Sequence, residues 1–143
     1  MLPQYMEQFN ERNPESMCFI NWTDQGPGKN PTFKRCMICV GSAVSAFKEH
    51  CRPLIGIDAC FLKGPHKGVL MIAMRSDDNN GQFHLAYRVA SCENEEKWSF
   101  FIHGLVVAVE ARDGSSKYTI VFDRHKVIPV SYTHLTLPTK RIV

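Results

Sequence analysis

The chain has 143 residues, the length of one domain of ordinary size. Its hydrophobic share of 44% and charged share of 22% are typical of a globular protein, and no apolar run approaches the roughly 20 residues that span a bilayer, so a disordered or membrane-embedded chain is excluded. Charges and prolines occupy the N-terminus where a secretory signal would be apolar, which predicts an intracellular protein with reduced cysteines.

The N-terminal third predicts a short helix and then a hairpin. Apolar residues recur at helical spacing from Leu2 to about Asn13. Strand-like segments follow at 16–23 and 32–41, and the loop between them is rich in Gly, Pro and Asn. Residues 42–51 are compatible with either a short helix or a loop.

Three consecutive strands, largely antiparallel, are predicted next. The first is apolar up to Ile57 and runs into Asp58, and the second covers residues 68–76. The turn sequence DDNNG then leads into residues 82–91, whose alternation predicts one shared face for the side chains of Phe83, Leu85, Tyr87 and Val89.

A long amphipathic helix and a last strand complete the pattern. Asn94 is suited to cap the helix, and 117–123 is an apolar strand that ends on Asp123. The helix would act as a crossover that brings the last strand into the same sheet, beside the first. Asp58 and Asp123 would then emerge side by side. The helical stripe consists of Trp98, Phe101, Ile102, Leu105, Val106 and Val109.

Two carboxylates at one sheet edge repel each other unless a cation or a proton lies between them. Mg²⁺ and Mn²⁺ prefer such oxygen ligands, and two of these ions about 4 Å apart support phosphodiester chemistry. The alternative interpretation is that each Asp only forms a turn after its strand. The residues alone leave both interpretations open.

Several motifs occur in a fixed order. CRPLIGIDACFLKG spans 51–64, DDNN follows at 77–80, and DRHK closes the pattern at 123–126. This arrangement, over about 33–128, resembles the catalytic core of plant Mutator-like element (MULE) transposases. Departures from the usual family form are Ala59, Phe122 and Val127. The matching residues are Cys51, Arg52, Pro53, Asp58, Phe61 to Gly64, Asp78, Asn79, Asn80, Trp98, Asp123, Arg124 and Lys126.

The resemblance implies an α/β, RNase H-like fold with a DDE-type site. Asp58 and Asp123 would be the first two catalytic and metal-binding acids, and two Mg²⁺ or Mn²⁺ ions would be the cofactors. The intact parent would cut and join DNA strands at element ends, in the nucleus, with no membrane partner and with scope for a homo-oligomer. No acidic residue follows Asp123, so the triad is incomplete and we expect the chain itself to be inactive. Alternatives are a domesticated nuclear DNA-binding regulator and a degenerate gene fragment without function.

Basic residues follow both acid-bearing strands. Lys63, Lys67, Arg124 and Lys126 are predicted to contact DNA phosphates, and the alternative for each is a solvated loop. Trp98, Gly64 and Asn80 are predicted to be structural.

The cysteines raise a further question. Cys36 and Cys39 could form half of a zinc site with His50 and Cys51. Strand alternation would turn Cys36 and Cys39 to opposite faces, which favours buried thiols instead.

The last residues differ in character from the rest. Residues 130–143 resemble translated sequencing-adapter sequence, and Val130 to Thr139 match it letter for letter. We therefore expect a pre-catalytic segment at 1–50, a partial transposase domain at 51–129 and a non-native tail at 130–143. Lys140 and Arg141 lie in that tail, and without them 15 basic side chains face 14 acidic ones, so the net charge falls from +3 to +1.

Overall fold

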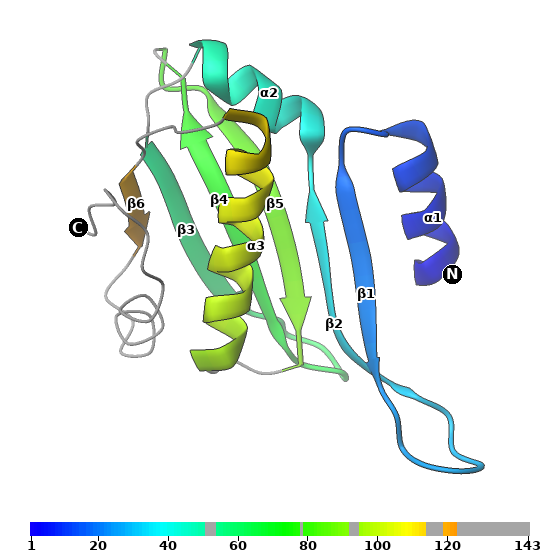
Figure 1. Ribbon diagram of the computed structural model, residues 1–143. Helices are drawn as coiled ribbons and strands as arrows, with labels where there is room; N and C mark the ends of the chain where they lie inside the picture. Colours follow the sequence, from blue (N-terminus) through cyan, green and yellow to red (C-terminus); the bar gives the residue numbers. More distant parts are fainter. Residues whose placement is uncertain (51–53, 78, 92–94, 114–118, 123–143) are drawn as a thin grey trace.

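The computed structural model describes residues 1–50, 54–77, 79–91, 95–113 and 119–122 (Figure 1). No helix among these residues is long and apolar enough to cross a membrane. In chain order the elements are α1 (Leu2–Arg12), β1 (Met17–Thr23), β2 (Thr32–Cys39), α2 (Gly41–His50), β3 (Leu54–Phe61), β4 (Val69–Ser76), β5 (Gln82–Ala90), α3 (Glu95–Asp113) and β6 (Thr119–Phe122).

The described strands form one mixed sheet in the order β1-β2-β5-β4-β3-β6. β3, β4 and β5 pair antiparallel with their neighbours, as predicted for three consecutive strands. After α3 the chain returns to pair β6 with β3 in parallel, which confirms the predicted crossover. The protein therefore has the α/β architecture predicted from its sequence, a mixed sheet with three antiparallel strands, a crossover helix and a fourth strand.

The N-terminal hairpin continues this sheet. β1 and β2 pair antiparallel, and β2 pairs in turn with β5. α1 begins with Pro3 in its first turn, a position where a missing N–H costs little, and lies beside β1 in Figure 1. Residues 41–50 are a helix, which resolves the alternative left open by the sequence.

The hydrophobic core lies between α3 and one face of the sheet (Figure 1). All members of the predicted helical stripe are at most 2% exposed, so the amphipathic interpretation of α3 is confirmed. Ile55 and Ile57 of β3 and Ile120 of β6 belong to the same cluster. Gly104 lets the helix approach the sheet closely, because a Cβ there would lie 3.1 Å from the sulfur of Met37.

One predicted pattern is wrong. Phe83, Leu85, Tyr87 and Val89 do not share a buried face: Leu85 is fully buried, Phe83 is 43% exposed, and the other two are half-buried. The ladder between β4 and β5 shifts register between Ala73 and Met74, so Leu85 forms a bulge. A bulge of one residue reverses the alternation on either side of it. Ala86, Arg88 and Ala90 are the fully buried residues after the bulge.

Candidate functional site

Asp58 lies inside β3 and not at its end. The strand continues through Ala59 and Cys60 to Phe61, so the polar residue did not terminate it. Ile57 is 4% exposed and belongs to the core under α3, whereas Asp58 is exposed. Because successive side chains of a strand alternate between faces, Asp58 projects from the face opposite to α3.

A straight row of partners crosses the sheet at the level of Asp58. Asp58 pairs with Ile72, Ile72 with Tyr87, Tyr87 with Ile38, and Ile38 with Cys18. Side chains directly opposite in neighbouring strands share a face. Ile72, Tyr87 and Ile38 are half-buried, so the acid stands at the border of a partly apolar surface.

The carboxylate of Asp58 is available on one side. Its Oδ1 accepts a hydrogen bond from the backbone N–H of Ala59 at 2.8 Å. This hydrogen bond orients the carboxylate, and the side chain of Asp58 is exposed. An oriented, exposed carboxylate is a suitable ligand for a hard cation.

β6 pairs with β3 up to the residue that precedes the second predicted acid. Ile57 of β3 is the register partner of Phe122, the last residue of β6. Asp58 follows Ile57, and Asp123 follows Phe122 in the sequence. Asp123 lies outside the described residues, as do Arg124 and Lys126.

The loop between β3 and β4 carries a group of exposed basic side chains. Lys63, His66 and Lys67 all lie in it and are exposed. The loop is closed by hydrogen bonds from Leu62 N to Gly68 O and from Lys67 N to Gly64 O, at 2.9 and 3.2 Å. These side chains lie just past the carboxyl end of β3, a few residues from Asp58.

The other residues predicted to be structural lie away from Asp58. Trp98 is 1% exposed in the core beneath α3. Asn80 adopts a positive φ of 62° in the turn between β4 and β5, at the opposite end of β4 from Lys63. There the carboxylate of Asp77 accepts hydrogen bonds from the N–H groups of Asn79 and Gly81. Asp77 and residues 79–81 thus form the predicted hairpin turn, and Asp78 lies outside the described residues.

Comparison with known proteins gives a family for this arrangement. Residues 54–139, which are more than half of the chain, match the family described as the MULE transposase domain. The chain belongs to this family. The match runs beyond Pro129 into the segment that resembles adapter sequence, and that part lies outside the described residues.

Among solved structures, the MULE domain is similar to the catalytic domain of Mos1 mariner transposase, at 12% identity and a TM-score of 0.42. The similarity covers 68% of this chain and 53% of that one, so the chain spans about half of the mariner catalytic domain. No curated protein matches the sequence.

The thiols of Cys18 and Cys36 hold their protons more tightly than an exposed thiol does. Burial raises the pKa of Cys18 to about 11, and the neighbouring Cys36 thiol contributes to the rise. Burial also raises the pKa of Cys36, although a backbone hydrogen bond with Val89 and the charge of Arg88 act to lower it. Cys36 pairs with Val89, whereas Cys39 belongs to the core under α3. The side chains of Cys36 and Cys39 thus point to opposite faces, and His50 and Cys51 offer no described side chain.

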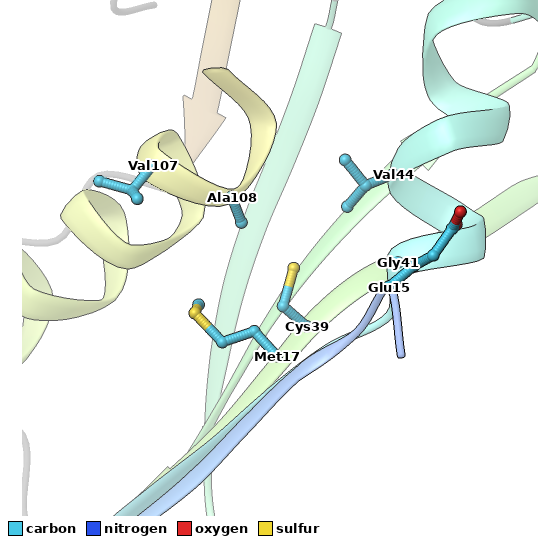
Figure 2. A pocket seen from close by; sticks show the side chains of 7 residues that line it. All are labelled: Glu15, Met17, Cys39, Gly41, Val44, Val107 and Ala108. Carbon is cyan, nitrogen blue, oxygen red and sulfur yellow. The ribbon is translucent and has the colours of Figure 1, made fainter. Parts of the chain in front are cut away.

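A cavity of about 190 Å³ lies on the other side of the MULE domain's sheet (Figure 2). Met17 and Cys39 are register partners, and their sulfur-bearing side chains rise between α2 and α3. Because Cys39 packs in the core under α3, this cavity is separated from Asp58 by the sheet. Its lining consists of Glu15, Met17, Cys39, Gly41, Val44, Val107 and Ala108.

Sequence reasoning missed two exposed aromatic residues at the end of the sheet where β3 finishes, one on β3 itself and one on β1 at the far side of the sheet. Phe61 is 72% exposed on the strand that carries Asp58, and Trp22 is 45% exposed on the hairpin. Periodicity assigns aromatic residues to the core by default, and neither residue breaks the strand pattern. The position of Trp22 next to the polar loop 24–31 could have indicated its exposure, because the alternation of core-facing and outward-facing side chains along the strand ends there.

Proposed function

We propose that this chain carries the first two catalytic acids of a DNA transposase that cuts and joins DNA strands at element ends. Asp58 and Asp123 are the proposed acids. The observation that carries the proposal is the parallel pairing of β6 with β3, because it sets Ile57 opposite Phe122, each of which precedes one of the two acids. Membership of the MULE transposase family supports the same assignment.

The donor chemistry of Asp58 fits a divalent cation. Its exposed carboxylate is a hard oxygen ligand and is oriented by the N–H of Ala59. Within the described ranges no three His, Cys, Asp or Glu side chains are grouped closely enough to hold a metal. We propose that Asp58 and Asp123 hold Mg²⁺ or Mn²⁺ together with a third acid that the sequence after Asp123 does not contain. When bound, two such ions activate an attacking hydroxyl and stabilise the leaving oxygen.

The cationic loop supports a DNA substrate. Lys63 and Lys67 are exposed just beyond the strand that carries Asp58, where they can contact backbone phosphates and hold a strand across the acids. Arg124 and Lys126 are proposed to contribute in the same way. We also propose that the activity is nuclear, since its DNA substrate would be chromosomal.

Metal binding tests the acid pair in this chain. Titration of Mn²⁺, followed by calorimetry, should show binding that Asp58→Asn and Asp123→Asn each weaken by at least tenfold. Asp24→Asn, which removes an exposed acid on the β1–β2 loop, is the matched control and should leave binding unchanged. Equal binding by all four proteins would contradict the assignment of Asp58 and Asp123.

Strand cleavage tests the reaction. We expect negligible cleavage by this chain, because the third acid is missing. A version extended through its native downstream sequence should cleave element-end DNA with Mg²⁺ or Mn²⁺, and replacing its third acid should abolish the cleavage. Failure of the extended protein to cleave with either ion would overturn the enzymatic proposal.

A further inference from the structure

The β1–β2 hairpin and the β3–β4 loop project from the same edge of the sheet. A row of register partners marks this edge: Asn21 with Arg35, Arg35 with Ala90, Ala90 with Val69, and Val69 with Phe61. Residues 22–34 and residues 62–68 both extend beyond this row, at the same end of the strands but from opposite sides of the sheet. In Figure 1 the hairpin reaches well beyond the rest of the sheet at this lower edge.

The hairpin presents aromatic and basic side chains beyond that row. Trp22 is 45% exposed and packs edge-on against its cross-strand partner Phe33, with ring centroids 6.1 Å apart. Lys29 is exposed in the loop and Lys34 is half-buried at its base. The acid in this segment, Asp24, accepts a hydrogen bond from Gly26 N–H at 2.9 Å, which holds its carboxylate in a turn.

The base of the hairpin is anchored to the core. The guanidinium of Arg35 lies 3.8 Å from the centroid of the Phe100 ring on α3. Its Nε also donates a hydrogen bond to the side-chain oxygen of Asn21 at 3.2 Å. Segment 22–35 contains three basic residues and one acid, so it carries a net charge of +2. The hairpin is therefore a positively charged two-stranded ribbon whose base is fixed.

We propose that the β1–β2 hairpin is a second DNA-binding element, which enters the major groove of duplex DNA next to the strand held at Asp58. This inference rests on the proposed function, and the hairpin precedes the residues that match the family. A two-stranded ribbon fits the major groove of B-form DNA, which is about 12 Å wide. Trp22 would contact base edges in the groove, while Lys29 and Lys34 bind the phosphates of its walls.

The spacing of the two elements suits one continuous duplex. β2 and β3 are separated by three strand intervals, which amount to about 14 Å at 4.8 Å per interval. This separation is comparable to the width of the major groove, so the ribbon can lie in the groove while Lys63 and Lys67 contact the adjacent phosphate row.

DNA binding without divalent ions tests the hairpin apart from the metal site. Fluorescence anisotropy of a labelled 20-base-pair duplex in EDTA should show binding that Trp22→Ala weakens about tenfold. The double variant Lys29→Gln/Lys34→Gln should reduce the slope of log affinity against log salt by about two, because each phosphate contact contributes about 0.9. Phe83→Ala is the matched control, since Phe83 is 43% exposed but lies at the opposite edge, and it should bind like the parent.

Intrinsic fluorescence gives a second measurement that needs no destabilised variant. The chain has two tryptophans, and Trp98 is only 1% exposed, so quenching by added DNA reports Trp22. Trp22→Phe should lose the quenching and keep most of the affinity. A duplex RNA of the same sequence should bind more weakly, because its major groove is too narrow and deep for a ribbon.

The possible outcomes decide between this inference and others. No DNA binding at low salt, equal affinity of the parent and both hairpin variants, or tighter binding of the RNA duplex would each overturn the hairpin assignment. Loss of self-association in Trp22→Ala, measured by light scattering with DNA affinity unchanged, would instead assign the hairpin to contact between copies. The hairpin assay contains EDTA and the Mn²⁺ titration contains no DNA, so failure of the metal assignment and failure of the hairpin assignment are distinguishable.

Discussion

The two faces of the sheet differ sharply although the same strands build both. On the face under α3, Ile55 and Met71 are fully buried, as is Leu105 on the helix itself. On the other face, at the level of the proposed site, Asp58 and Cys60 are exposed and Ile72 is half-buried. Along β3, successive side chains alternate between the buried face and the exposed face. The comparison indicates that the α3 face determines stability and leaves the Asp58 face available for binding.

The largest effect is expected on the α3 face. Phe101→Ala removes a fully buried ring and should lower the free energy of unfolding by about 3 to 5 kcal/mol, since the cavity cannot be filled by neighbours. Denaturation in urea measures the loss. Val107→Ala is the control on the same helix: Val107 is 46% exposed, and its replacement should cost well under about 1 kcal/mol. Similar losses for both variants would remove the distinction between the faces.

A smaller, pH-dependent effect on stability is expected from Cys18, which belongs to the row of register partners of Asp58. Burial raises the pKa of Cys18 from 9.0 to about 11, so the folded state holds this proton more tightly than the unfolded state. The stabilisation is complete below pH 9 and is lost as the pH rises through 11. Urea denaturation from pH 8 to pH 11 should therefore show a steeper decline for the parent than for Cys18→Ala. Parallel pH profiles would show that the Cys18 thiol is not protected by the fold.

The smallest effect on stability is expected at the proposed site itself. Asp58→Asn keeps the shape of an exposed side chain and should change the free energy of unfolding by no more than about 0.5 kcal/mol. Thermal unfolding in the absence of metal measures this. A loss as large as that of Phe101→Ala would mean that Asp58 serves the fold and would argue against a binding role.

Most of the fold could be predicted because its signals are local or periodic. The stripe from Trp98 to Val109 specifies α3 and its buried face, and the turn chemistry of Asp77 and Gly81 specifies the β4–β5 hairpin. The order of three strands, a helix and a strand then leaves few topologies, which is why the place of β6 beside β3 was predictable. The pairing of β2 with β5 was not, because residues distant in sequence carry no mark of their partners.

The remaining differences come from tertiary context. The alternation of β5 suggested one buried face, but the bulge at Leu85 reverses the pattern, and a bulge depends on the register of the neighbouring strand. Asp58 suggested a strand end, yet β3 continues to Phe61 because a polar side chain is tolerated on an open face. For the candidate site, the sequence predicted that the last strand lies beside the strand of Asp58, as it does, while the place of Asp123 stays a prediction. The exposed Trp22 required the structure, since exposure is a property of the assembled sheet.

The pairing of β6 with β3 also has a consequence for the order of folding. Leu54 pairs with Thr119, which lies 65 residues further along the chain, whereas β3, β4 and β5 pair with near neighbours. Contacts between distant residues form late because closing a long loop is entropically costly. We therefore expect the meander of β3, β4 and β5 to fold before β6 docks. The pairing of Phe122 with Ile57, the residue before Asp58, is then completed last, once the meander is in place.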